Sequence, residues 1–434
     1  MLTFALRSSV SWMAVDTPAR IVVLGAGPTG LETALYARFL GYDVDVFERG
    51  GVAENVLGWG HVRMFSPFWM NRSPLGMAAV AAQNRSWQPP PEDALLTGRQ
   101  WAEAYLLPLA ASDLLADHIH TQTRVLAVGR DALLKGDRLG DDERAGLPFR
   151  VLTRDSRGQE QVHLADVVID ATGTYGHHNW LGAGGIPAIG ERATAECIEY
   201  GLPDILGAER EHYAGKRVLL VGAGYSAATN TVALAELADS APGTQVTWIT
   251  RHTPHPGNGP IGLIPADRLA QRDQLARRAG ELAHATGGPI RYYPGTTVEA
   301  VRQGGTKNGW KVQLAGEHAG EFEFDRIIAN VGYRPDNSLY GELHVHECYG
   351  GGGPMRLAAS LLKQPSADCL DQTLASAETL SNPEPDFYIL GAKSYGRNSH
   401  FLIFVGLEQV RQLFTIIGDR ADLDLYASVR PLSS

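Results

Sequence analysis

Short apolar runs and helical patterns alternate at the start of the chain. The run IVVL after residue 20 is typical of a strand that is buried on both faces of a parallel sheet. A glycine turn follows, and TGLETALYARFLG then carries apolar residues at helical spacing as far as Gly41. The run VDVF, which is closed by Glu48, has the pattern of a second strand. Residues 20–48 are therefore predicted to form a β-α-β unit.

The same pattern returns in the middle of the chain. The segments VLLV, GAGYSAATN and VTWIT follow one another from residue 218. Residues 148–176 and 309–334 also resemble each other, because each contains a strand that begins with an aromatic residue, a polar turn, a second strand, an aspartate and a further apolar strand. Two copies of one unit are the prediction. The alternative is that two hairpins are alike by chance.

The remaining segments decide the order of the domains. Residues 98–113 have a helical pattern, and residues 131–146 are polar enough to be an exposed loop. Residues 386–419 have the pattern of strand, glycine turn, loop and helix, without a glycine fingerprint of their own. We therefore expect this tail to complete the first domain after the second domain has been inserted.

The predicted fold class is α/β, with two Rossmann-like dinucleotide-binding domains, the second inserted into a discontinuous first domain. The expected division is an N-terminal extension at 1–18, a first domain at 19–195 and 326–434, and an inserted domain at 196–325. The N-terminal segment lacks the apolar core of a signal peptide, and Met13 is an alternative start to Met1.

Composition and charge narrow the classes of function. Of the 434 residues, 44% are hydrophobic and 20% are charged, which is typical of a folded globular protein. The net charge of −10 argues against a nucleic-acid partner, because phosphate binding requires a basic surface. No apolar run approaches the ~18 residues of a membrane-spanning helix, so no membrane partner is expected.

The cysteines bear on the redox environment. Cys197, Cys348 and Cys369 lie far apart, and none of them belongs to a C-x-x-C pair. Such a sparse set indicates reduced thiols in a cytoplasmic protein, and each cysteine is expected to be a small buried apolar residue. No spacing of histidines, cysteines and carboxylates is typical of a metal site, so no metal is expected.

The first glycine turn has the chemistry of a phosphate-binding site. Gly25, Gly27 and Gly30 satisfy G-x-G-x-x-G between a strand and a helix. The first glycine permits the tight turn, the second permits close approach of a pyrophosphate, and the third permits the helix to pack on the strand. The N-terminus of that helix attracts phosphates. Glu48 ends the second strand, where an acid accepts hydrogen bonds from an adenosine ribose, so this fingerprint predicts nucleotide binding.

The second fingerprint differs in its charged residue. Gly222, Gly224 and Ala227 form the glycine pattern, with alanine at its third place, and the following strand leads to Arg251 instead of an acid. A carboxylate there would repel a 2′-phosphate, whereas a guanidinium binds it through charge-assisted hydrogen bonds. We therefore expect NADP(H) in preference to NAD(H). The alternative is that Arg251 is a solvated charge of a loop.

These residues resemble the two-dinucleotide-domain flavoproteins, the superfamily that holds thioredoxin reductases and flavin-containing monooxygenases. The matching segments are GAGPTG with Glu48, DATGTYG at 170–176, YAGKRVLLVGAGYSA at 213–227 and NVGYRPD at 330–336. The resemblance implies that the first fingerprint binds FAD and the second binds NADPH. The implied FAD-binding residues are Gly25, Gly27, Pro28, Thr29, Gly30, Glu48, Arg49, Trp59, Thr172, Gly173, Gly391 and Ser394. The implied NADPH-binding residues are Gly222, Gly224, Tyr225, Ser226, Ala227 and Arg251.

The departures from this superfamily bear on the reaction. Thioredoxin-reductase-like enzymes pass electrons to a cysteine pair, which this chain lacks. The segment CIEYGLPDILGAEREHYAGKRV does not match the F-x-G-x-x-x-H motif common in flavin-containing monooxygenases, and the tail lacks the G-D pair of disulfide reductases. Ornithine and lysine N-hydroxylases share FAD, NADPH and the lack of a cysteine pair. The chain therefore resembles a divergent branch near the FAD/NADPH monooxygenases.

The segment that follows Glu48 is rich in aromatic residues, namely Trp59, Phe65, Phe68 and Trp69. In related monooxygenases this part of the chain reaches the flavin, and such rings suit a water-poor wall around a reactive intermediate. The polar residues among them are the candidate catalytic residues: Asn71, His61, Arg63 and Ser66. The alternative is that the rings are ordinary core and that His61 is a buried histidine.

Two further loops are candidates for the rim of the pocket. The run HHNW at 177–180 follows the DATG segment, and a solvated loop is the alternative there. In the tail, Ser394, Arg397, Asn398 and His400 precede a helix whose N-terminus can stabilise negative charge on a reduced flavin.

These patterns and the resemblance together predict an enzyme, an FAD-dependent NADPH oxidoreductase of the monooxygenase type. We expect it to insert one oxygen of O2 into a small substrate with a nitrogen, sulfur or carbonyl group, through a flavin C4a-(hydro)peroxide. The expected partners are that small-molecule substrate and O2, with a homodimer implied by family habit. The alternatives are a reductase or oxidase of a small acceptor that inserts no oxygen, and a non-catalytic flavoprotein.

Overall fold

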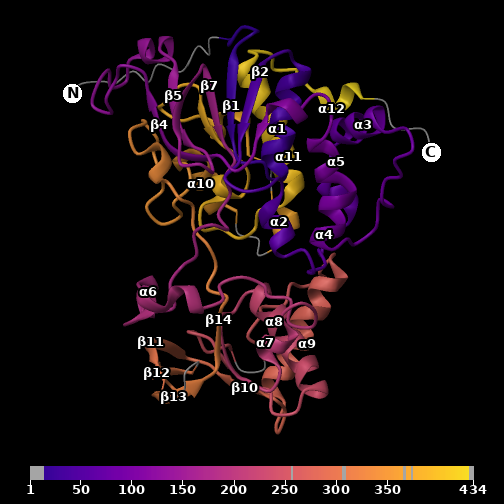
Figure 1. Cartoon of the computed structure of the whole chain (residues 1–434), viewed down its shortest axis with the longest axis vertical. Coiled ribbons are helices and arrows are strands. Elements are labelled where there is room, and N and C mark those ends of the chain that lie inside the picture. Colours follow the sequence, from indigo (N-terminus) through magenta and orange to yellow (C-terminus); the bar gives the residue numbers. More distant parts are fainter. Residues whose placement is uncertain (1–13, 256–257, 305–308, 365–367, 373–374, 430–434) are drawn as a thin grey trace.

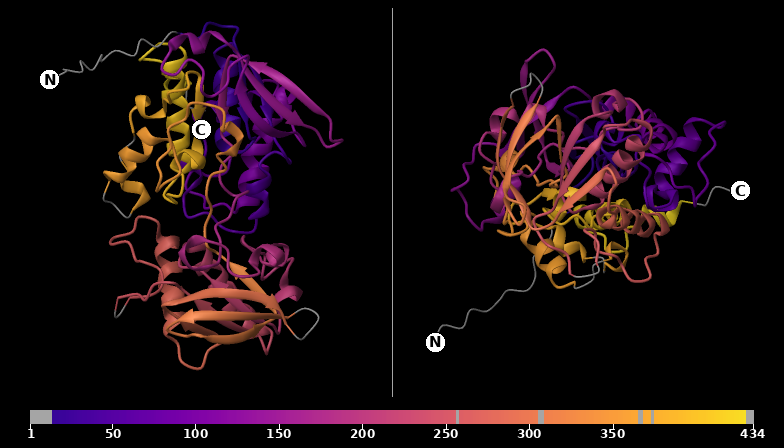
Figure 2. Two further views of the ribbon diagram at one scale, coloured as in Figure 1. Left: turned by 90° about the vertical axis from the view of Figure 1, so that its left-hand side faces the viewer. Right: turned by 90° about the horizontal axis from the view of Figure 1, so that it is seen from below.

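The protein folds into two units that lie one above the other (Figure 1). The computed structural model describes residues 14–255, 258–304, 309–364, 368–372 and 375–429. The first unit, in the upper part of Figure 1, combines the N-terminal and C-terminal thirds of the chain, and the second unit is built from the middle. The view from the side shows the same two units, joined by narrow connections (Figure 2).

The first unit is built on a parallel sheet with the strand order β15-β7-β1-β2-β3. The strands are β1 (Arg20–Leu24), β2 (Asp43–Phe47), β3 (Ile119–His120), β7 (Val167–Asp170) and β15 (Phe387–Ile389). An antiparallel sheet, β4-β5-β6, is attached to it, with β4 (Arg124–Arg130), β5 (Phe149–Arg154) and β6 (Glu160–Ala165). Since β15 pairs with β7, the C-terminal tail completes this sheet as predicted.

The second unit repeats this design. Its parallel sheet has the order β10-β9-β8-β14, and an antiparallel sheet, β11-β12-β13, is attached to it. The strands are β8 (Arg217–Val221), β9 (Gln245–Ile249), β10 (Ile290–Tyr293), β11 (Thr296–Gln303), β12 (Trp310–Gly316), β13 (Gly320–Phe324) and β14 (Arg326–Ala329). The predicted duplication is confirmed, and among the described residues β15 is the strand of the first sheet that has no counterpart in the second.

The two aspartates of the internal repeat lie at equivalent positions. The Asp166 carboxylate accepts a hydrogen bond from the Arg20 N–H at 2.8 Å, at the start of β1. The Asp325 carboxylate accepts one from the Arg217 N–H at 2.8 Å, at the start of β8. Each aspartate therefore fastens the strand that leaves the hairpin to the strand that carries the fingerprint.

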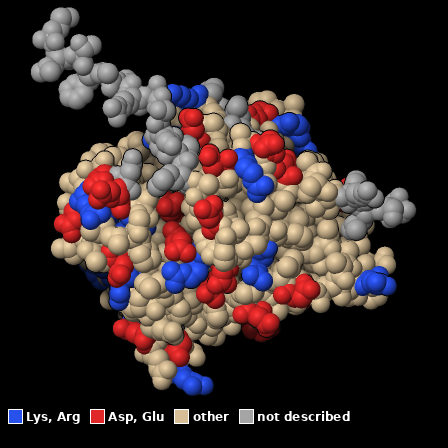
Figure 3. All heavy atoms as spheres, turned by 90° about the horizontal axis from the view of Figure 1, so that it is seen from above, with Lys and Arg blue, Asp and Glu red and all other residues tan. Residues whose placement is uncertain are grey.

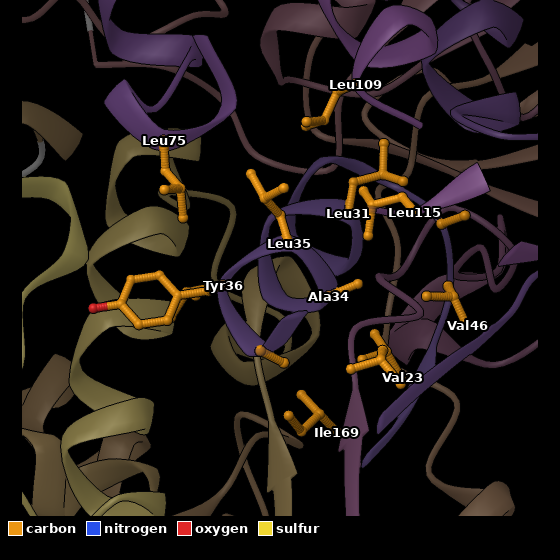
Figure 4. Close-up of a cluster of buried hydrophobic side chains, with 14 of the residues drawn as sticks. Val23, Leu31, Ala34, Leu35, Tyr36, Val46, Leu75, Leu109, Leu115 and Ile169 are labelled. Atoms are coloured by element: carbon orange, nitrogen blue, oxygen red, sulfur yellow. The ribbon is translucent and has the colours of Figure 1, made fainter. Parts of the chain in front are cut away.

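Helix α1 (Pro28–Phe39) fills the centre of the first unit, because nine of its residues are buried. Its side chains Leu31, Leu35 and Tyr36 pack between the sheet and the neighbouring helices (Figure 4). The other long helices are α3 (Pro74–Gln83), α8 (Tyr225–Ser240), α9 (Ala270–His284), α10 (Met355–Leu362) and α11 (Ile403–Ile417). The shorter ones are α2 (Glu54–Gly58), α6 (Glu191–Thr194), α7 (Arg210–Tyr213) and α12 (Leu425–Ser428).

The helical pattern at 98–113 is confirmed in three consecutive pieces. They are α4 (Gly98–Trp101), a π-helical turn (Ala102–Leu106) and α5 (Leu107–Ala110). The side chains of Trp101, Tyr105 and Leu109 lie in the main core of the first unit. This segment therefore covers α1 from the side opposite the sheet.

The expected domain boundaries are wrong in two places. Strand β14 was assigned to the first domain, but it pairs with β8 in the second sheet. Residues before 196 were assigned to the first domain, but Leu181 and Ala188 belong to the same core as Val298 of β11. The chain crosses between the units where His178 and Tyr333 form a β-bridge. The units therefore comprise residues 14–180 and 331–429, and residues 181–330.

Two other expectations change with the packing. Residues 1–13, including Met1 and Met13, lie outside the described residues, but Val15 of the expected loose extension donates its N–H to the Ile417 carbonyl at 2.9 Å. The expected exposed loop at 131–146 contains Arg144, whose guanidinium is buried against Glu384 at 3.0 Å. The polar composition of this segment predicted exposure. Arg144 is buried instead, because a distant segment supplies the carboxylate that pairs with its charge.

The surface charge and the apolar character of the helices are relevant to nucleic-acid and membrane partners. Seen from above, acidic and basic side chains are interspersed over the end of the first unit (Figure 3). The acidic excess is therefore not gathered into one patch on that face. In the described part of the chain, no helix combines the length and the apolar character that crossing a membrane requires.

Candidate functional site

The first fingerprint needs all three of its glycines for different physical reasons. Gly25 has a φ of +97°, and a Cβ there would lie 2.9 Å from the Ala171 carbonyl oxygen. A Cβ on Gly30 would lie 1.9 Å from the Gly25 carbonyl oxygen, so α1 packs directly on the turn. A Cβ on Gly27 would meet nothing within 4 Å. Open space at Gly27, beside a tightly packed turn, is the arrangement that a pyrophosphate requires.

Glu48 lies against this fingerprint, as its position predicted. Its carboxylate accepts a hydrogen bond from the Ala26 N–H at 2.9 Å and another from the Gly50 N–H at 2.9 Å. A carboxylate offers about four lone-pair sites, so acceptor capacity remains for the hydroxyl groups of a ribose. The Arg49 guanidinium lies against Gly176, because a Cβ there would be 2.6 Å from its Nη1 atom.

The DATG turn meets the C-terminal tail beside the fingerprint. Both the N–H and the hydroxyl of Thr172 donate to the Asp170 carboxylate, at 3.1 and 2.6 Å. The other Asp170 oxygen is 2.6 Å from the Lys393 ammonium, which also donates to the Thr172 hydroxyl at 3.1 Å. Gly173 follows with a φ of +67° and open space at its Cβ position. Sequence reasoning did not find Asp170 or Lys393, because their segments are far apart in the chain.

The tail also contacts the beginning of α1. Gly391 has a φ of +69°, and a Cβ there would lie 2.9 Å from the Thr29 hydroxyl oxygen. The Ser394 hydroxyl donates to the Gly391 carbonyl at 2.7 Å and accepts from the Gln409 amide of α11 at 2.9 Å. The Ser394 side chain is therefore used inside the loop, and the N-termini of α1 and α11 converge at Gly391.

This arrangement fits the adenosine and pyrophosphate parts of FAD. Helix α1 begins at Pro28 without a side-chain cap, so N–H groups of its first turn are available for phosphate oxygens. The space at Gly27 admits the phosphates, and Glu48 lies where a ribose would follow. The indole N–H of Trp59 is buried and has no acceptor among the described residues, so it is a further candidate donor to the cofactor.

The aromatic segment after Glu48 does not form one continuous wall. Phe68 is fully buried in the core and packs edge-on against Tyr105, whereas Trp69 is 54% exposed. Trp59 is partly buried and packs on the same core. Phe65 points elsewhere, toward the second unit. The expected water-poor wall is therefore reduced to Trp59 and Phe65 as candidates.

Asn71 and Ser66 lie together and hold their own loop. The Asn71 amide donates to the Ser66 carbonyl at 3.2 Å, to the Ser66 hydroxyl at 2.9 Å and to the Pro67 carbonyl at 2.9 Å. Its backbone carbonyl accepts from the Trp101 indole at 3.0 Å. Since these contacts use the Asn71 donors, its observed role is to shape the loop, and its catalytic role stays a prediction.

His61 and Arg63 are both exposed, so the alternative of a buried His61 is wrong. The Arg63 guanidinium donates to the Leu95 carbonyl, and Arg63 also forms a β-bridge with Thr97. In the tail, Arg397 and Asn398 are exposed. The structure therefore does not gather these polar residues around one point.

The second fingerprint is built in the same way, except that its third position accommodates an alanine. Gly222 has a φ of +136°, and a Cβ there would lie 2.2 Å from the Asn330 carbonyl oxygen. Gly224 has open space at its Cβ position, and α8 begins at Tyr225 without a side-chain cap. The methyl group of Ala227 is fully buried at the third position. The N–H groups at Tyr225 and Ser226 are therefore available for a second pyrophosphate.

Arg251 lies just after β9, beside the second fingerprint. It is exposed, and among the described residues it has no hydrogen-bond or ion-pair partner. The preceding Thr250 is buried, and its hydroxyl contacts the Tyr292 hydroxyl at 2.6 Å. The backbone before Arg251 is thus fixed while its guanidinium is available to bind an anion.

Side chains of the two units meet beside the second fingerprint. Phe65 of the first unit packs against Tyr225, with ring centroids 5.6 Å apart. Arg272 of α9 donates to Asp368 of the first unit at 2.8 Å and to the Cys369 sulfur at 3.0 Å. Burial opposes ionisation of Asp368, but hydrogen bonds from the Leu370 N–H and from Arg272 lower its pKa below the usual value. These contacts hold the starts of α8 and α9 against the first unit.

All three cysteines are free thiols. Cys369 is buried, as expected, whereas Cys197 is exposed and Cys348 is half-buried. The expectation of three buried cysteines is therefore wrong for Cys197. Burial raises the pKa of the Cys369 thiol despite its contact with Arg272, so this thiol is not activated as a nucleophile.

The chain is similar to known proteins in its three-dimensional structure. No protein-family model and no curated protein sequence matches the chain. The bacillithiol disulfide reductase YpdA from Bacillus cereus superposes with a TM-score of 0.63 and 19% identity, over 93% of this chain and 99% of that chain. The FAD-bound cadaverine monooxygenase DfoA from Erwinia amylovora gives 0.62 and 14%, over 96% and 100%. Thioredoxin reductase from T. acidophilum gives 0.53 and 17%, over 92% and 97%.

These solved structures match nearly the whole of this chain, and they include both reductases and a monooxygenase. The superpositions therefore agree with the duplicated α/β architecture described above. They also agree with the resemblance that the two fingerprints indicated. The chain has the fold of the flavoproteins with two dinucleotide-binding domains.

Proposed function

We propose that this protein is an FAD-dependent NADPH oxidoreductase that acts as a monooxygenase on a small molecule. The observation that carries the proposal is the pair of fingerprints, of which one lies beside an acid and the other beside a free arginine. Two dinucleotide sites on one chain allow two cofactors to bind together and to exchange a hydride. The contact between Phe65 and Tyr225 supports transfer across the boundary between the units.

The residues of the chain have separate tasks in this proposal. The glycine turn, the first N–H groups of α1 and Glu48 bind and orient FAD. The start of α8 binds the pyrophosphate of NADPH, and Arg251 binds its 2′-phosphate. When bound, FAD supplies hydride acceptance and the activation of O2. The N-terminus of α11, near Gly391, favours negative charge in the flavin region.

The net reaction converts substrate, O2, NADPH and a proton to oxygenated substrate, NADP⁺ and water. One oxygen atom enters the substrate and the other leaves as water, and NADPH supplies the two electrons. The substrate class is a small molecule with a nucleophilic nitrogen or sulfur atom, or a ketone. The cysteines support this route over a thiol relay, because they form no pair and the buried thiol has a raised pKa.

A second candidate is an NADPH-dependent reductase of a small acceptor that inserts no oxygen. It is favoured by the similar superposition on YpdA, whose TM-score of 0.63 nearly equals the 0.62 of DfoA. The same first and second sites would operate in it. The two candidates differ only in where the electrons leave, and they share the cofactors and the hydride-transfer step.

The deciding experiment measures NADPH oxidation and O2 consumption with a panel of amines, thioethers and ketones, using isotopically labelled O2. The monooxygenase proposal expects substrate-stimulated consumption of both and one labelled oxygen atom in the product. Turnover that continues without O2 and leaves no label in any product would establish the reductase instead. As a control, Cys369→Ser should keep the monooxygenase activity, because no thiol takes part.

A further inference from the structure

A buried charge pair lies directly beneath the DATG turn. The Lys393 ammonium is 2.6 Å from the Asp170 carboxylate, and both side chains are 0% exposed. Lys393 also donates to the Thr172 hydroxyl, and its ammonium lies 5.2 Å from the centre of the Tyr340 ring. Thr172 is only half-buried. The pair therefore contacts the surface of the candidate site through Thr172.

The second unit lacks this pair at the equivalent position. Asp170 lies opposite Leu24 in the pairing of β7 with β1, and Ala329 lies opposite Val221 in the pairing of β14 with β8. Leu24 and Val221 both immediately precede their fingerprints. Strand β15, whose following turn carries Lys393, has no counterpart in the second sheet within the described part of the chain. The repeated unit folds without this pair, so it is an addition specific to the first site.

Such a pair is a costly way to stabilise a fold. Burying two charges loses their hydration, and a buried pair often contributes no more stability than apolar residues of the same volume. The advantage of such a pair is that it orients a neighbouring polar group. The ammonium donates a hydrogen bond to that group and the carboxylate accepts one from it. That group is the Thr172 hydroxyl, which donates to Asp170 at 2.6 Å and accepts from Lys393 at 3.1 Å.

The pair thereby sets what Thr172 can offer to a ligand. A hydroxyl has one donor and two acceptor sites. Asp170 takes the donor and Lys393 takes one acceptor site, which leaves one lone pair. Thr172 can then accept a hydrogen bond from a ligand, but it has no proton to donate to a phosphate. Its partner on the cofactor must be a hydroxyl or a ring N–H group.

We propose that Lys393 is a positioning residue for FAD, which acts through Thr172. Together with Asp170, it holds the Thr172 hydroxyl as an acceptor for a hydroxyl or ring N–H group of the cofactor. The inference rests on the proposed binding of FAD to the first unit. It does not depend on whether the reaction inserts oxygen.

The test is a double-mutant cycle on the FAD dissociation constant of the apoprotein, with Lys393→Met, Thr172→Val and the double variant. Each single change should weaken FAD binding at least tenfold. The FAD dissociation constant of the double variant should not exceed the larger of the two single-variant constants. The reason is that both changes remove the same hydrogen bond to the cofactor. Additive losses, or wild-type affinity in Lys393→Met, would overturn the inference.

Two further variants separate positioning from stability. Thr153→Val is the matched control, because Thr153 is a buried threonine of β5 whose hydroxyl bonds only within the hairpin sheet. It should lower the melting temperature slightly and leave FAD affinity unchanged. If Lys393→Met does not fold, the pair variant Lys393→Met with Asp170→Asn carries no buried charge, and it should still bind FAD at least tenfold more weakly. Wild-type affinity there would also overturn the inference, whereas a wild-type protein that binds no FAD would overturn the proposed function instead.

Discussion

The two fingerprints hold their helices at different distances from the turns that precede them. In the first unit, a Cβ at position 30 would lie 1.9 Å from the Gly25 carbonyl oxygen. In the second unit, the equivalent position is Ala227, whose methyl group is fully buried without disturbing α8. The same pattern of residues therefore tolerates one more carbon atom in one copy than in the other. The third glycine is a requirement of packing in the first copy only.

The copies differ in charge as well as in packing. The first site has Glu48 against its turn and the Asp170–Lys393 pair beneath it. The second site has Arg251 beside its turn and Ala329 at the place of Asp170. In the proposed function, one duplicated scaffold thus presents an acid to one cofactor and a cation to the other. This difference is what the assignment of FAD and NADPH to separate sites depends on.

The largest expected effect separates the packing of the two helices. Gly30→Ala places a methyl group against a backbone carbonyl that cannot move aside, so we expect a loss of about 3 kcal/mol or more in stability and no retained FAD. Ala227→Gly adds no clash and should cost only about 2 kcal/mol, from lower helix propensity and the loss of one buried methyl group. Thermal unfolding and FAD content of the two purified variants measure the contrast. Equal losses in both would show that the helices pack alike.

The sequence was sufficient to predict what local pattern controls. The fingerprints, the place of Glu48 at the end of its strand and the equivalent places of Asp166 and Asp325 in the two repeats follow from the order of short segments. Lys393 was not predictable, because its partner Asp170 is 223 positions away in the chain. A lysine among glycine and serine indicates an exposed loop until the fold supplies the carboxylate.

A candidate catalytic residue has a weaker sequence signature than a candidate cofactor-binding residue. A dinucleotide fingerprint depends on a backbone conformation that requires glycine at fixed positions, so it can be recognised in the sequence. Asn71 was chosen because of its position among aromatic rings, but its amide bonds to Ser66 and Pro67. A side chain that holds a loop and one that contacts a substrate have the same sequence signature. Only the hydrogen bonds distinguish them.

The second largest effect concerns Glu32 of α1, whose equivalent position in α8 has no carboxyl group. Burial raises the pKa of Glu32 to about 7, against the opposing effect of the Ser73 and Tyr426 hydroxyls. The equivalent residue of α8 is Thr229, whose hydroxyl donates to the Tyr225 carbonyl at 2.9 Å. Glu32→Gln should therefore stabilise the first unit at high pH, by at most about 3 kcal/mol.

The sign of this pH dependence follows from the two states. Between about pH 4.5 and pH 7 the unfolded chain has released the Glu32 proton while the folded chain retains it, so the stability of the wild type falls as the pH rises. Above pH 7 both states are ionised and the loss is complete. The melting temperature of Glu32→Gln relative to the wild type should therefore rise from pH 5 to pH 8. A constant difference over that range would mean that Glu32 is ionised in the folded protein throughout.

The next effect tests the cation of the second site. Arg251→Ala should raise the Michaelis constant for NADPH by about tenfold to a hundredfold and leave that for NADH unchanged, because hydrogen bonds to a charged group are worth about 1.5–3 kcal/mol. Steady-state kinetics with both nucleotides measures it. The neighbouring exposed His252→Ala is the control and should change neither constant. A wild-type preference for NADH would remove the proposed role of Arg251.

The smallest effect tests the acid of the first site. Glu48→Gln keeps the shape of the side chain but turns one acceptor into a donor, which then opposes the N–H of either Ala26 or Gly50. The lost hydrogen bond is worth about 1 kcal/mol, so the dissociation constant for FAD should rise about fivefold while NADPH binding is unchanged. Glu54→Gln is the control, because the exposed Glu54 at the start of α2 accepts from the Gly51 N–H of the same connection. If both variants weaken FAD binding equally, Glu48 stabilises the loop and does not bind the ribose.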